Sequence, residues 1–70
     1  MDICEDKDQA LADAFREART NGRGHCFAVF VPANPNYPEG AWFTTMRKPM
    51  TRTREWQVIE CTADGRTLLA

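Results

Sequence analysis

The sequence predicts a single α+β domain of two layers, in which an N-terminal helix packs on an antiparallel meander sheet of three or four strands. Three observations lead to this fold class. Apolar residues recur with helical spacing near the start of the chain, and later segments combine β-branched with aromatic residues. Short connections that contain glycine or proline separate these segments. The 70 residues (1–70) are enough for only one small domain.

The helix is expected over residues 2–20, because one face of a helical wheel at about 100° per residue is apolar there. Asp2 and Glu5 fit a capping box at its start. Asp6 or Asp8 is the alternative cap of a helix that begins a turn later. The apolar face comprises Ile3, Cys4, Ala10, Leu11, Ala14, Phe15 and Ala18.

The strands follow the helix, which Asn21-Gly22 is expected to end because asparagine and glycine favour a left-handed stop. The first strand is apolar nearly throughout and is therefore expected at the centre of the sheet. Three prolines in residues 32–40 predict a stiff, extended loop after it. The strands are expected at His25–Val31, 41–47 and 53–62, with a short fourth strand at Thr67–Leu69.

The composition limits the classes of function. A net charge of −1 does not predict bulk binding to nucleic acid or to a membrane surface. The charge is segregated nevertheless, because residues 1–20 sum to −3 and residues 21–70 sum to +2. The hydrophobic content of 43% supplies one compact core. Because such a core gives only roughly 3–5 kcal/mol of net stability, a protein partner or a homodimer would add to it.

Three features bear on the location of the protein. The acidic first residues predict no secretory leader. No apolar run reaches the roughly 18 residues of a membrane span, so we expect no membrane partner. Three cysteines without close spacing predict reduced thiols in a cytoplasmic protein.

A metal or thiol enzyme is the third function class that we consider, and the spacing of its residues argues against it. His25 and Cys26 are adjacent in a strand, so their side chains should point to opposite faces of the sheet. Structural zinc sites contain closely spaced ligand pairs, and the chain has none. It also lacks phosphate-binding loops and nucleophile motifs. We therefore expect packed thiols, no metal, no cofactor and no enzymatic activity. The groups concerned are Cys4, His25, Cys26 and Cys61.

An acidic ridge on the predicted helix is the first candidate binding surface. Its four carboxylates fall within about 60° of one another on the helical wheel. Such a ridge complements a basic surface and could occupy a groove that normally takes a nucleic-acid backbone. The alternative is an ordinary solvated helix face. The ridge consists of Asp2, Asp6, Asp13 and Glu17.

A basic hairpin is the second candidate surface, and nucleic acid is the partner that it suggests. Positive groups beside exposed aromatic rings can bind phosphate and stack bases, although a solvated hairpin tip has the same composition. The basic residues are Arg47, Lys48, Arg52 and Arg54. The nearby aromatic residues Trp42, Phe43 and Trp56 would form an exposed contact patch unless the proline-rich loop folds over them.

The small size, the helix-then-strands order and the lack of catalytic motifs resemble the general design of small phage- or mobile-element-encoded inhibitors, anti-CRISPR proteins among them. The resemblance is one of architecture. It implies a non-enzymatic protein-binding module that occludes a basic or nucleic-acid-binding surface of a protein partner. The alternative prediction is a small nucleic-acid-binding domain.

Overall fold

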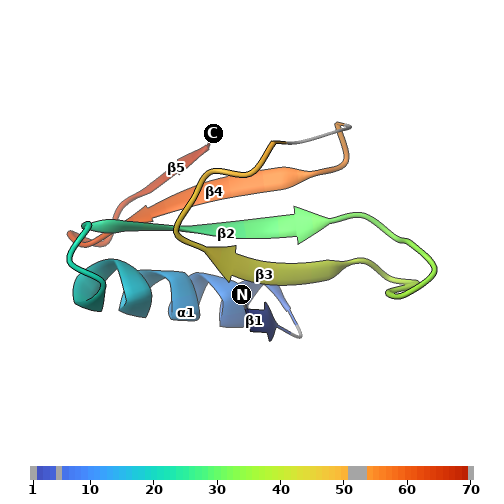
Figure 1. Cartoon of the computed structure of the whole chain (residues 1–70), viewed down its shortest axis with the longest axis horizontal. Helices are drawn as coiled ribbons and strands as arrows, with labels where there is room; N and C mark the ends of the chain where they lie inside the picture. Colours follow the sequence, from blue (N-terminus) through green and yellow to red (C-terminus); the bar gives the residue numbers. More distant parts are fainter. Residues whose placement is uncertain (1, 5, 51–53, 70) are drawn as a thin grey trace.

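The computed structural model describes residues 2–4, 6–50 and 54–69. Within them the chain forms one helix on one face of a five-stranded antiparallel sheet of order β1-β3-β2-β4-β5 (Figure 1). The predicted two-layer α+β class, a helix on an antiparallel sheet, is confirmed. The elements are β1 (Asp2–Cys4), α1 (Lys7–Thr20), β2 (His25–Val31), β3 (Ala41–Thr45), β4 (Gln57–Thr62) and β5 (Thr67–Leu69).

The start of the chain corrects the prediction of a helix over residues 2–20. Residues 2–4 form β1, which pairs with β3 so that Ile3 lies opposite Phe43. The helix begins at Lys7, and the side chain of Asp6 accepts a hydrogen bond of 2.8 Å from the backbone N–H of Gln9. The predicted capping box at Asp2 is therefore wrong, and the alternative cap at Asp6 is confirmed. Without β1, strand β3 would be an edge with unpaired backbone N–H and C=O groups. Pairing with β3 satisfies these groups and those of residues 2–4.

The strand order corrects the simple meander, because β3 and β4 are not neighbours. Strand β2 lies between them and is antiparallel to both, so β3 and β4 run parallel and segment 46–56 crosses β2. In the same way α1 crosses β3 on its path from β1 to β2. The parallel pair β1 and β2 points in the opposite direction to the parallel pair β3 and β4, and both connections move the same way across the sheet. Connections of the usual right-handed kind must then lie on opposite faces of the sheet. Figure 1 shows the chain just after β3 passing in front of β2, with α1 behind the sheet.

The face under α1 is packed through small helical side chains. Ala10, Ala14 and Ala18 recur once per turn and are 0–2% exposed, so the helix backbone approaches the sheet closely. The sheet fills the space with larger groups, and the rings of Phe30 and Trp42 lie 5.4 Å apart. The sheet residues of this cluster are Cys26, Ala28, Trp42, Ile59 and Cys61, with Phe30 at its margin.

The opposite face holds a second cluster of Phe27, Val29, Phe43 and Val58, which are only 0–7% exposed. Half-buried Trp56 packs against it. The predicted exposed aromatic patch is therefore wrong, because Phe43 is buried here and Trp42 is buried under α1. In the proline-rich loop, which we considered as a cover, Asn34 and Tyr37 bond to each other and Tyr37 is exposed.

Candidate functional site

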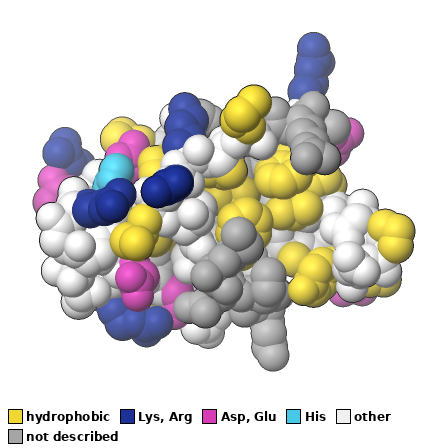
Figure 2. Space-filling model, viewed as in Figure 1, with side chains coloured by type: hydrophobic (Ala, Val, Ile, Leu, Met, Phe, Trp, Pro, Cys, Tyr) yellow, Lys and Arg dark blue, Asp and Glu magenta, His cyan; other side chains and the backbone are white. Residues whose placement is uncertain are grey.

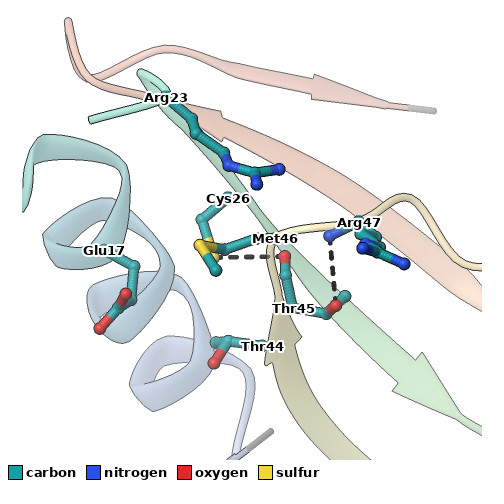
Figure 3. Close-up of a pocket in the computed structure, with 7 residues that line it drawn as sticks. All are labelled: Glu17, Arg23, Cys26, Thr44, Thr45, Met46 and Arg47. Carbon is teal, nitrogen blue, oxygen red and sulfur yellow. Dashed lines mark hydrogen bonds between the residues drawn. The ribbon is translucent and has the colours of Figure 1, made fainter. Parts of the chain in front are cut away.

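A cavity of about 380 Å³ lies beside the C-terminal half of α1. It lies where β2 begins and β3 ends, between the two connections that join these strands to the rest of the chain (Figure 3). Its lining is mixed, with two arginines, one carboxylate, two hydroxyls and two sulfur atoms. The lining residues are Glu17, Arg23, Cys26, Thr44, Thr45, Met46 and Arg47.

Local hydrogen bonds fix the two arginine-bearing connections. The side chain of Asn21 donates to the carbonyl of His25 at 2.9 Å and accepts from the N–H of Arg23 at 2.8 Å. On the other side, the N–H of Arg47 donates to the hydroxyl of Thr45 at 3.3 Å. Within the described residues no ion pair joins either guanidinium to a carboxylate. The guanidinium groups of Arg23 and Arg47 can therefore bind a negatively charged ligand at the cavity.

Two buried thiols face each other next to this cavity. Cys26 of β2 and Cys61 of β4 are directly opposed in the sheet and belong to the cluster under α1. The Cys26 thiol donates a hydrogen bond of 3.3 Å to the carbonyl of Thr45. Burial raises the pKa of Cys26, and burial followed by the charges of Cys26 and Glu60 raises the pKa of Cys61 to about 11. Both groups are therefore protonated at neutral pH and react slowly.

His25 lies on the opposite face of the sheet from Cys26, as strand alternation predicts. Its Nδ1 is 3.3 Å from a carboxylate oxygen of Glu60, and its ring lies 5.5 Å from that of Phe27. The structure does not bring His25 and Cys26 together as a nucleophile and base. No group of three or more histidine, cysteine, aspartate or glutamate residues in the described ranges is arranged to hold a metal ion.

The predicted acidic ridge is rearranged. Asp2 lies in β1 and not on the helix, and Asp6 is the helix cap. Asp13 is half-buried and pairs with Arg16 at 2.8 Å. Glu17 is exposed and lines the cavity. The four residues therefore do not belong to one helical row, although Asp13 and Glu17 still share a flank of α1 by helical spacing.

The predicted basic hairpin is a crossover, since β3 and β4 are not adjacent. Arg47, Lys48 and Arg54 are exposed along it, whereas Arg52 falls outside the described residues. Figure 2 shows this side of the molecule, where Lys and Arg side chains adjoin a hydrophobic area. The aromatic rings expected beside them are buried or half-buried, so they offer no open platform for stacked bases.

The sequence reasoning did not identify Arg23 or the cavity. Arg23 stands between two glycines in a short link, and no local pattern relates it to Arg47, which is far along the chain. Only the pairing of β2 with β3 brings the two connections to the same end of the sheet.

Comparisons with known proteins do not identify a relative: no family model, curated protein or solved structure matches the chain. In the described part of the chain no helix is both long and apolar enough to cross a membrane.

Proposed function

We propose that the chain is a small non-enzymatic protein-binding module, of the kind by which phages and mobile elements inhibit host proteins, and that it covers a basic surface of its partner. One observation carries the proposal: Asp13 and Glu17 share one flank of α1 by helical spacing, Asp6 caps the start of the helix, and the neighbouring edge strand contains Asp2. A strip of like charge of this kind steers a partner of opposite charge and sets the orientation of docking.

The geometry of the sheet supports a common acidic edge. Glu17 and Thr44 line the same cavity, and Thr44 is paired with Asp2 across β3 and β1. Two carboxylate-bearing positions from different elements therefore lie at one side of the molecule. The buried alanines of α1 orient this flank, because they fix which side of the helix faces the sheet.

The three helical carboxylates should contribute unequally to binding. Asp6 and Glu17 are exposed, whereas Asp13 is half-buried and already bridged to Arg16. An existing ion pair offsets part of the charge that a partner would experience. We therefore assign the larger part of the partner recognition to Asp6 and Glu17.

Charge reversal tests the proposal. Tagged wild-type protein, Asp6→Lys, Glu17→Lys and the control Asp8→Lys are used to capture partners from host lysate, with quantitative mass spectrometry as the readout. Asp8 is an exposed acid of the same helix on a different side, so its reversal changes the net charge equally. We expect the Asp6 and Glu17 variants to lose at least about tenfold in capture at low salt, and Asp8→Lys to retain it. Equal capture by all four proteins rejects the acidic edge.

Nucleic-acid binding is the second candidate function, and the exposure of Arg47, Lys48 and Arg54 on one crossover is the observation that favours it. Three phosphate contacts to a single strand predict a slope of log K against log salt of about −2. Fluorescence anisotropy with a labelled oligonucleotide measures this slope. Reversal of the three residues to glutamate should abolish the binding, and unchanged binding or no binding by the wild type rejects this candidate.

A further inference from the structure

We propose that Cys26 and Cys61 are a cross-strand thiol pair that a small carboxylate-bearing disulfide converts to an intramolecular disulfide, with Cys26 as the thiol that is attacked first from the cavity. This modification site goes beyond the proposed protein-binding function, although Glu17 lies at both. Three features of the described residues carry it: the opposition of the two cysteines in the sheet, the access that the cavity gives to one of them, and the two arginines at that cavity.

The opposition of the cysteines matches the geometry of a disulfide. Cys26 and Cys61 are direct partners in the antiparallel pair of β2 and β4, and both side chains lie on the face under α1. Directly opposed residues have Cα atoms roughly 4.5–5.5 Å apart. A disulfide accepts Cα separations of about 4.4–6.8 Å. The Cβ atoms of directly opposed residues lie roughly 4.5–5.5 Å apart, and a disulfide needs about 3.5–4.5 Å, so the bond requires a small approach of the two strands. It also requires a rotation of Cys26 about its Cα–Cβ bond away from the carbonyl of Thr45.

The cavity distinguishes the two thiols. Cys26 belongs to its lining, and Figure 3 shows the side chain of Cys26 beside that of Met46 between α1 and the arginines. Both thiols are buried, with Cys26 1% and Cys61 0% exposed, but Cys61 is absent from the lining of both described cavities. A reagent therefore reaches Cys26 first, and Cys61 can react only with a sulfur atom that is already bound to Cys26.

The charges around the cavity select the reagent. Arg23 and Arg47 come from two different connections, and both guanidiniums are exposed. Guanidinium groups bind carboxylates through paired hydrogen bonds. A disulfide that carries carboxylates, such as glutathione disulfide, is therefore concentrated next to Cys26, whereas a neutral disulfide is not.

The reaction is balanced in two exchange steps. The Cys26 thiolate attacks one sulfur of the reagent, the reagent S–S bond breaks, and the leaving thiolate takes up the proton released by Cys26. The Cys61 thiolate then attacks the Sγ of Cys26, and the second reagent thiol leaves with the proton of Cys61. Two protein thiols are oxidised and one reagent disulfide is reduced to two thiols.

The charged groups around the pair predict a slow reaction at neutral pH that accelerates in alkali. Glu17 from α1 opposes ionisation of Cys26, and Glu60 from β4 opposes ionisation of Cys61. Arg23 and Arg47, from the two connections, line the same cavity as Cys26. Since the thiolate is the reacting form, the rate should increase with pH as each thiol ionises.

The principal experiment leaves both core cysteines intact. The Cys4→Ser protein, which removes the third thiol, is incubated natively with glutathione disulfide at pH 8, quenched with acid and examined by intact mass and peptide mapping. We expect a mass lower by two hydrogens and a cross-link between the peptides of Cys26 and Cys61. Two free thiols in the native protein, under conditions that oxidise a denatured control, overturn the proposal. A stable glutathione adduct or a disulfide-linked dimer of the native protein overturns it as well.

A second experiment tests the arginines without touching the core. In the Cys4→Ser background, Arg23→Gln and Arg47→Gln should slow oxidation by glutathione disulfide by about tenfold at low ionic strength. Oxidation by the neutral hydroxyethyl disulfide should be unchanged. Arg19→Gln, an exposed arginine of α1 outside the cavity, is the matched control. Equal rates for all variants with the anionic reagent show that the cavity does not select it.

Discussion

The two faces of the sheet are buried by different means. Under α1, a regular helix presents alanine at each turn, and the bulk of the core comes from the sheet. On the other face, the described parts of the crossover, residues 46–50 and 54–56, contain no helix or strand, and the cluster there consists of larger side chains such as Phe27 and Phe43. A regular cover needs small contact residues, whereas an irregular cover can adjust to large ones.

This difference has consequences for how each face tolerates change. A helix packs as a rigid unit, so a cavity beneath it closes poorly. An irregular segment has fewer backbone hydrogen bonds to lose and can move toward a cavity. The contrast between a rigid and an adjustable cover is what the following predictions test, beginning with the largest expected effect.

Adjacent residues of β3 provide the most direct test, because Trp42 faces α1 and Phe43 faces the crossover. Trp42→Ala should cost about 3–5 kcal/mol of unfolding free energy, which is comparable with the whole stability of a domain this small. Phe43→Ala should cost less, because the crossover can collapse onto the vacated space. Urea unfolding in the presence of a stabilising osmolyte measures both values. A larger loss for Phe43→Ala than for Trp42→Ala would show that the crossover is the more rigid cover.

Gly40 gives a second test at the margin of the helix-covered face. Its φ is +81°, and an added Cβ would lie 2.6 Å from the ring of Phe30 and 2.7 Å from the carbonyl oxygen of Val31. Gly40→Ala should therefore cost about 2–4 kcal/mol, since it combines backbone strain with displacement of a ring that packs on Trp42. Gly65→Ala is the control, because its φ of +88° carries the same strain in open space. The difference between the two variants in the free energy of unfolding, measured by urea denaturation, gives the cost of the clash alone.

The pH dependence of stability gives a smaller effect that is specific to the helix-covered face. The pKa of Cys61 is raised from 9.0 to about 11, so the native state holds its proton longer than the unfolded state does. The sign follows from linkage: this stability is fully present below pH 9 and is lost as the pH rises toward 11. The loss is of the order of 2 kcal/mol. Denaturant unfolding from pH 8 to 11 should show a smaller decline for Cys61→Ala than for the wild type, and parallel declines would contradict the assignment.

Much of the fold could be predicted from the sequence because its signals are local. The apolar run of β2 predicts both its bounds and its central position, and both are confirmed. The end of α1 before Asn21-Gly22 follows from local stop residues. The strand β1 was missed because three residues are too few to show a period, and Ile3 and Cys4 matched the apolar stripe of a longer helix. The crossover was missed because a connection of moderate length does not reveal which strand it reaches.

The candidate site was harder to predict than the fold, because long-range strand pairing brings its residues together. Glu17 was identified as an acidic surface residue, but its position beside Cys26 and Arg23 follows from how α1 lies on the sheet. Equally, Cys26 and Cys61 were expected to be packed thiols, whereas their direct opposition is set by the register of β2 against β4. Alternation determines a face, and only the register determines a neighbour.

The strand order also implies a direction of folding. The central strand β2 comes from the middle of the sequence, its neighbours β3 and β4 follow it along the chain, and the outermost strands β1 and β5 come from near the two chain ends. The strands are thus arranged outward from β2, with the strands nearest the chain ends at the two edges of the sheet. Of the two pairings of the central strand, that of β2 with β3 closes a shorter loop than that of β2 with β4. This hairpin is therefore the natural nucleus at the centre of the sheet, and the outer strands extend its edges. The chain ends are the last parts to be added, one at each border of the sheet, so attachments at the two ends would project from opposite sides of the finished domain.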